Sequence, residues 1–126
     1  MTDFNSLENE TAAILKAKAS EIYVNFLSIE KAWGELGTMI NTTAVGKTNP
    51  EFNMLLTQVR NTQMSTFTPS REVVFKKVRQ IVNEVEGCNG DFAIHSVRIK
   101  AMNEASQKAT DAYLQVLSQY KKLIGK

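Results

Sequence analysis

The last third of the chain, residues 91–126, carries the pattern that most constrains the fold. Residues there recur at alternating spacings of three and four, giving the series Phe92, His95, Ile99, Met102, Ser106, Ala109, Tyr113, Val116, Tyr120 and Leu123. This heptad seam predicts one long helix, because a strand would alternate with a period of two. So long a helix is not stable alone in water, and its apolar stripe must be covered by other helices.

A second seam of the same kind runs through the first third of the chain. From Ile22 onward the spacing of three and four is unbroken, through Phe26, Ile29, Trp33, Leu36 and Ile40. We therefore expect a second long helix at about 6–41. Gly34 and Gly37 are its weak points, since each glycine costs about 1 kcal/mol relative to alanine in a helix. A kink or an early end near Gly34 is the alternative.

Between the two seams the sequence predicts two shorter helices. Asn49-Pro50-Glu51 is typical of a helix start, and the apolar residues that follow indicate a helix at about 50–66. Thr68-Pro69 repeats the start signal and predicts a separate helix at about 69–86. β-Branched residues in 72–85 raise the alternative of a strand, but the spacing of Val74, Val78, Ile81 and Val85 favours a helix.

These four segments predict an all-α protein with one domain over residues 1–126. The expected architecture is an up-down-up-down helical bundle with long outer helices at about 6–41 and 91–124 and short middle helices at about 50–66 and 69–86. Because the middle helices are half as long as the outer pair, we expect the N-terminal end of the first helix and the C-terminal end of the last to project as a two-helix arm.

The predicted arm carries more apolar surface than one partner helix buries. Soluble monomers rarely expose large apolar patches, so we expect a second copy or a helical protein partner to pack on the arm. The sequence thus favours a non-enzymatic, self-associating structural or assembly subunit, or an interaction adaptor. The predicted interface residues are Leu15, Ile22, Tyr113, Val116, Leu117, Tyr120 and Leu123.

A nucleic-acid-binding or nucleoprotein subunit is the alternative function. Phosphate binding needs several cations on one face, and base stacking needs exposed aromatic rings nearby. The candidate cations are Arg60, Arg71, Lys76, Lys77, Arg79 and Arg98. Phe67 and Phe75 are close in sequence, but Glu72 interrupts the basic run, and the net charge of +2 is small.

Catalytic and metal chemistry has one candidate cluster, formed by Cys88, Asp91 and His95. A metal site usually needs three or four ligands with an organised second shell, and the chain has no other cysteine or histidine. A thiolate pair of Cys88 and His95 would lack a third group to orient it. We therefore expect no enzyme, no cofactor and no metal.

The location of the protein is predicted from what its sequence omits. The acidic, polar N-terminus lacks the basic start and apolar run of a signal peptide, and no apolar stretch approaches the ~18 residues of a membrane helix. A single cysteine forms no internal disulfide and fits a reducing compartment. These features predict a cytoplasmic protein with no membrane insertion.

Overall fold

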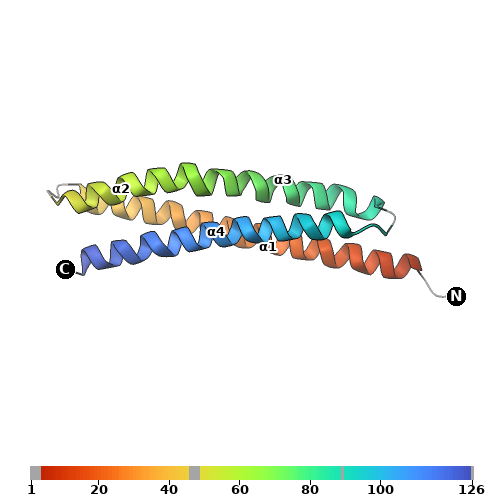
Figure 1. The fold of residues 1–126 in the computed structure, drawn as a ribbon. Helices are drawn as coiled ribbons and strands as arrows, with labels where there is room; N and C mark the ends of the chain where they lie inside the picture. The colour runs from red at the N-terminus through yellow and green to blue at the C-terminus, as the bar shows by residue number, and fades with distance from the viewer. Residues whose placement is uncertain (1–3, 46–48, 89, 126) are drawn as a thin grey trace.

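Three long helical rods lie side by side along most of their length (Figure 1). The computed structural model describes residues 4–45, 49–88 and 90–125. The first rod is α1 (Phe4–Ala44) and the last is α4 (Ala93–Ile124). The segment between them consists of α2 (Pro50–Thr62), the π-helical turn η1 (Gln63–Phe67), α3 (Thr68–Glu84) and the 3-10 turn η2 (Val85–Gly87). We call this continuous segment, Pro50–Gly87, the middle rod.

The junction between α2 and α3 differs from the sequence-based prediction. The predicted break before Pro69 is absent, because the helix continues through η1, where the backbone N–H of Thr68 donates to the carbonyl of Gln63, five residues earlier. In a regular α-helix the ring of Pro69 would clash with the carbonyl of Ser65. We attribute the π turn to this conflict, since a turn with a wider hydrogen-bonding pattern lets a helix pass a proline without ending.

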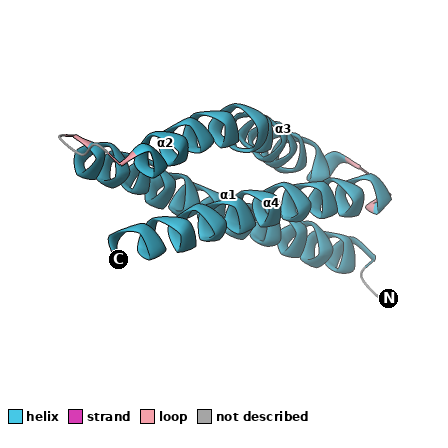
Figure 2. Cartoon of the chain, turned by 60° about the vertical axis from the view of Figure 1, so that its left-hand side comes forward, coloured by secondary structure: helices cyan, strands magenta, loops and turns pink. Residues whose placement is uncertain are grey.

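The all-α prediction is confirmed for the described residues, but the four-helix arrangement is not what the structure shows. α1 and α4 run in one direction and the middle rod runs back between their ends, which gives three antiparallel-connected rods (Figures 1 and 2). The middle rod runs along the pair for most of its length, and the first turns of α1 extend alone beyond its end (Figure 1). Near one end Lys16 Nζ lies 2.7 Å from Glu86 Oε1, and near the other Leu55 and Leu123 line one shallow groove. No two-helix arm projects.

α1 is one helix through Gly34 and Gly37 and extends to Ala44, so the alternative of an early end near Gly34 does not occur. At the start of α2 the predicted cap is confirmed: the Asn49 side-chain oxygen accepts a hydrogen bond of 2.9 Å from the backbone N–H of Glu51. This bond satisfies one of the free donors at the helix start.

Both predicted seams supply the core. α1 buries residues at the expected spacing of three and four, as does α4, and the middle rod adds aromatic and β-branched residues between them. The fully buried side chains include Phe26, Ile40, Phe67, Val74, Ile81, Val85, Met102 and Val116. Small residues of the seams, such as Ala19 and Ala109, are also fully buried, where they let the rods approach closely.

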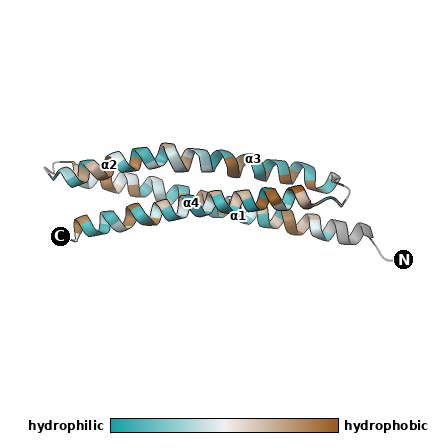
Figure 3. Cartoon of the chain, viewed as in Figure 1, coloured by the Kyte–Doolittle hydropathy of each residue, from teal (hydrophilic) through white to brown (hydrophobic). Residues whose placement is uncertain are grey.

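Polar and apolar segments are interleaved along every helix (Figure 3). Within the described ranges, none of the helices contains a stretch that is both long and apolar enough to cross a membrane. This pattern is the one expected of helices that bury one face and leave the other in water.

Candidate functional site

The predicted interface residues contribute to the chain's own core. Four of the seven are buried and three are half-buried, in the order Leu15, Ile22, Val116 and Tyr120, then Tyr113, Leu117 and Leu123. The hydroxyl of Tyr120 also forms a hydrogen bond of 2.8 Å with Thr43 Oγ1. The two-helix arm is not formed, because α1 and α4 run in the same direction, so that the N-terminal end of α1 and the C-terminal end of α4 lie at opposite ends of the molecule (Figure 1). Contact of a second chain with the buried four would require the bundle to open.

Farther out, α4 keeps a narrow exposed apolar strip. Leu114 and Ile124 each remain 53% exposed, and the half-buried Leu117 lies between them. Their spacing of three and seven residues places them on one side of the helix. We call Leu114, Leu117 and Ile124 the α4 strip; Leu114 was not among the apolar residues that the sequence predicted at the interface.

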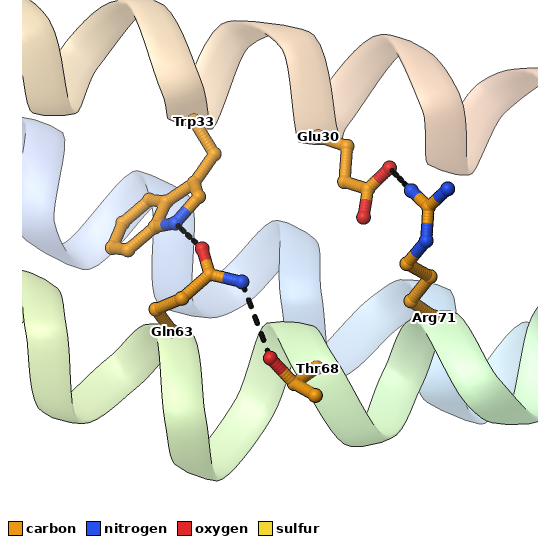
Figure 4. Close-up of polar contacts among 5 residues, drawn as sticks. All are labelled: Glu30, Trp33, Gln63, Thr68 and Arg71. Carbon is orange, nitrogen blue, oxygen red and sulfur yellow. Dashed lines mark hydrogen bonds and ion pairs between the residues drawn. The ribbon is translucent and has the colours of Figure 1, made fainter.

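Two of the six candidate nucleic-acid-binding cations are engaged by acids. Arg71 forms an ion pair with Glu30 of α1 (Figure 4). Its guanidinium also lies 4.1 Å above the centre of the Phe75 ring. Arg98 Nη1 lies 3.4 Å from Glu84 Oε2, and its side chain is only 12% exposed. The charge of both arginines is therefore partly neutralised within the protein, and Phe75 is covered rather than free to stack on a base.

The remaining cations do not gather on one face. Lys76 and Arg79 are exposed on α3 and Lys77 is half-buried, whereas Arg60 lies on α2 beside α1. Phe67, the second aromatic candidate for base stacking, is completely buried. Among the described residues, Lys76 and Arg79, three apart on α3, are thus the exposed candidate cations that share a face, and neither Phe67 nor Phe75 is exposed for base stacking.

In the candidate cluster of Cys88, Asp91 and His95, the thiol and the imidazole make contacts within the fold. His95 is buried, and its Nδ1 lies 3.3 Å from Arg98 Nη1. A guanidinium only donates, so Nδ1 accepts and the imidazole carries its proton on Nε2. The Cys88 thiol donates to the carbonyl of Val85 at 2.9 Å. Across 4–45, 49–88 and 90–125, no group of three or more His, Cys, Asp or Glu side chains is placed to hold a metal ion.

The most developed concave feature is a groove between α1 and the start of the middle rod, with a volume of about 680 Å³. We call it the Trp33 groove. One wall comes from α1 and the other from α2 and η1, and the lining residues are Trp33, Gly34, Gly37, Thr38, Asn41, Leu56, Val59, Arg60, Gln63 and Met64. The groove is open to solvent along its length and mostly apolar, as ligand and peptide sites usually are.

Trp33 lines the groove and is held in place by contacts with the middle rod. Its indole stacks on Phe67 with ring centres 4.4 Å apart and planes 11° from parallel. Its Nε1–H donates to Gln63 Oε1 at 2.7 Å, and Gln63 Nε2 donates in turn to Thr68 Oγ1 at 3.3 Å (Figure 4). These contacts join α1 to both ends of the π turn. A π turn within a helix often marks a functional position.

The two glycines explain why the groove is open. A methyl group added at Gly34 would meet no atom within 4 Å, whereas one added at Gly37 would lie 3.8 Å from Val59 Cγ1. The two walls are thus within van der Waals range of each other near Gly37, and there is open space beside Gly34, the neighbour of Trp33.

One exposed methionine borders the groove. Met64 is 74% exposed and lines it, whereas Met54, 70% exposed, lines a separate shallow groove between α2 and α4. Methionine is flexible and polarisable, and it is frequent on surfaces that accept varied apolar partners. Met64 is therefore a suitable contact for an apolar side chain of a bound molecule.

Sequence reasoning placed Trp33 correctly in the core seam but did not predict the groove. It treated Gly34 and Gly37 as weak points of a helix, although two glycines beside a core tryptophan are also the signal for an open helix face. The position of the second wall was not predicted either, because Thr68-Pro69 indicates the start of a separate helix and not the middle of one continuous rod.

Comparisons of the chain with protein-family models, with curated proteins and with solved structures give no match. The function is therefore argued from the geometry of the site.

Proposed function

We propose that the protein is a non-enzymatic interaction adaptor that binds a helix of another protein in the Trp33 groove. The observation that carries the proposal is the groove itself, which is apolar, about 680 Å³ in volume and bordered by the exposed Met64. Helix-in-groove binding uses this kind of surface, with apolar side chains of the bound helix inserted between two helices of the receptor.

The chemistry of the lining supports binding rather than catalysis. Arg60 is the charged group among the described lining residues, and they include no carboxylate, imidazole or thiol. Nucleophilic or acid–base catalysis would need such a group next to the bound molecule. Burial of apolar side chains, by contrast, needs only the surface that Leu56, Val59 and Met64 leave exposed.

A peptide-display selection tests the proposal. A library of random peptides of about 14 residues, long enough for four helical turns, is selected on the wild-type chain and counter-selected on Gly34→Leu. The added leucine occupies the open space beside Trp33, so groove-dependent peptides should lose at least about tenfold in affinity, the effect of losing one buried apolar anchor.

Gly34→Ala is the matched control for this selection. Both substitutions remove the glycine from α1, but alanine leaves most of the groove empty, so Gly34→Ala should bind the selected peptides nearly as well as the wild type. Trp33 is the only tryptophan in the chain, and its fluorescence reports occupation of the groove without a label. Recovery of no groove-dependent peptide would contradict the proposal.

Self-association as an assembly subunit is the second candidate, favoured by the α4 strip. Leu114 and Ile124 expose apolar surface on one side of α4 that a second copy would bury. Light scattering over a concentration series should then show a dimer or larger species. Leu114→Lys should shift it toward monomer without unfolding, because this side chain is already half in water. A monomer at all concentrations would exclude this candidate.

A further inference from the structure

The two walls of the Trp33 groove differ in charge, and this difference bears on what binds there. The α1 wall is uncharged and low, formed by Gly34, Gly37, Thr38 and Asn41. The opposite wall carries Arg60, one turn before Met64 along the middle rod. An occupant therefore meets a smooth neutral helix on one side and a guanidinium on the other.

The shape of the α1 wall fits a helix better than an extended peptide. The residues of the wall recur at spacings of three and four, so they form one stripe of small or short side chains along α1. A second helix approaches such a stripe closely, and one of its large apolar side chains has room beside Gly34, where an added methyl group would meet no atom within 4 Å. The groove also lacks the exposed backbone donors and acceptors that an extended strand would pair with.

Arg60 is free to interact with the occupant. Arg71 and Arg98 have acidic partners, but Arg60 forms no ion pair within the part of the chain that the structure describes. A helix docked over Arg60 would remove water from its guanidinium. This desolvation is unfavourable unless the occupant supplies a carboxylate, and it is worse if the occupant supplies a lysine.

On this geometry we infer that the natural occupant of the Trp33 groove is an amphipathic helix with an acidic edge: one large apolar side chain enters beside Trp33, and a glutamate or aspartate on the same helix pairs with Arg60. The inference rests on the proposed adaptor function and adds the chemistry of the partner to it. A second copy of this chain is the competing occupant.

The test uses a display library of alanine-rich helices of about four turns. Apolar residues are fixed along one face, and the positions flanking that face are randomised over Glu, Gln and Lys. The library is sorted in parallel on the wild-type chain, on Arg60→Glu and on Arg79→Glu. Arg79 is exposed on α3 and does not line the groove, so Arg79→Glu is the charge-matched control.

The wild type and Arg79→Glu should both enrich glutamate at one flanking edge, and Arg60→Glu should enrich lysine there. Individual peptides that differ by Glu→Gln should differ by about two- to five-fold in Kd on the wild type, as expected of a partly exposed ion pair. On Arg60→Glu the difference should reverse, with the glutamine peptide binding more tightly than the glutamate peptide. The quenching or shift of Trp33 fluorescence confirms that the peptides occupy the groove.

Three outcomes would overturn the inference. The first is groove-dependent binding without a preference for glutamate, which leaves the adaptor function intact but removes its acidic partner. The second is the same enrichment on Arg60→Glu as on the wild type. The third is a wild-type dimer that Gly34→Leu, but not Gly34→Ala, converts to monomer, because a second copy would then occupy the groove. Absence of any binder would contradict both the inference and the adaptor function.

Discussion

The two halves of the middle rod are held very differently by their neighbours. The half from Thr68 to Gly87 buries Val74, Ile81 and Val85 almost completely. Two ion pairs connect this half to α1: Arg71 with Glu30, and Glu86 with Lys16. The half from Pro50 to Phe67 leaves two methionines largely exposed and has a shallow groove on each side, one toward α1 and one toward α4.

This difference separates stability from binding within one helical rod. The half that contains α3 fills the space between α1 and α4, so it supplies much of the packing that stabilises the fold. The half that contains α2 contacts the same two helices less completely, so its surface is available to another molecule. Substitutions in the half that contains α3 should therefore mainly change stability, and substitutions in the half that contains α2 should mainly change binding.

The largest effect is expected from truncating the core of the α3 half. Ile81 is fully buried, so Ile81→Ala should lower the free energy of unfolding by about 3 kcal/mol through lost burial and the cavity left behind. Leu56→Ala, in the half-buried wall of the Trp33 groove, should lower it by about 1 kcal/mol. Urea unfolding followed by circular dichroism measures both. Equal losses would show that the two halves are held alike.

The next effect concerns the bonds at the boundary between the halves. Trp33→Phe keeps an aromatic ring against Phe67 but removes the donor to Gln63 Oε1, and it should destabilise the chain by about 1–2 kcal/mol. Adding Gln63→Leu should cost less than it does alone, because the partner that it would leave unsatisfied is already gone. A double-mutant cycle measures this coupling, and strictly additive losses would argue against it.

Much of this fold follows from local periodicity. The seams that place Phe26 and Ile40 in α1 and Met102 and Val116 in α4 depend only on the spacing of residues along one helix, and those residues are indeed buried. The extents of α1 and α4 were predicted to within a few residues for the same reason. Residues 46–48, part of the connection after α1, lie outside the described part of the chain.

What local periodicity does not contain is how the helices meet. Thr68-Pro69 signals a helix start when read alone, and Thr68 still adopts helical backbone angles of −62° and −49°, which a following proline disfavours. Packing on α1 and α4 outweighs this preference. Because the middle rod is continuous, its first half lies beside the end of α4 that carries Tyr120 and forms the second wall of the Trp33 groove. The spacing of residues within α1 or α4 does not predict either contact.

A smaller effect on stability, a gain instead of a loss, is expected in the α1 wall of the Trp33 groove. Gly34→Ala should stabilise the chain by about 0.5–1 kcal/mol, because alanine favours the helix and its methyl group meets no neighbouring atom within 4 Å. Thermal unfolding measures the gain. Gly37→Ala is the matched control on the same helix; its methyl group would only touch Val59, so it should stabilise to a similar extent. Loss of stability in Gly34→Ala would mean that the groove is narrower than described.

The smallest effect should be a pH dependence of stability at the contact between α1 and the end of the middle rod, where Glu86 pairs with Lys16. The hydrogen bond and the charge of Lys16 hold the pKa of Glu86 below its ordinary value of 4.5. A lowered carboxyl pKa stabilises the folded state above the ordinary value, and this contribution disappears as the pH falls through the lower, folded-state pKa. The stability difference between the wild type and Glu86→Gln should therefore be measurable at neutral pH and shrink below about pH 4. Because both side chains are exposed to water, the difference should also shrink in high salt. Glu72→Gln, at another exposed glutamate of the middle rod, is the control. If Glu72→Gln showed the same pH dependence as Glu86→Gln, the effect would reflect overall charge and not the contact between α1 and the end of the middle rod.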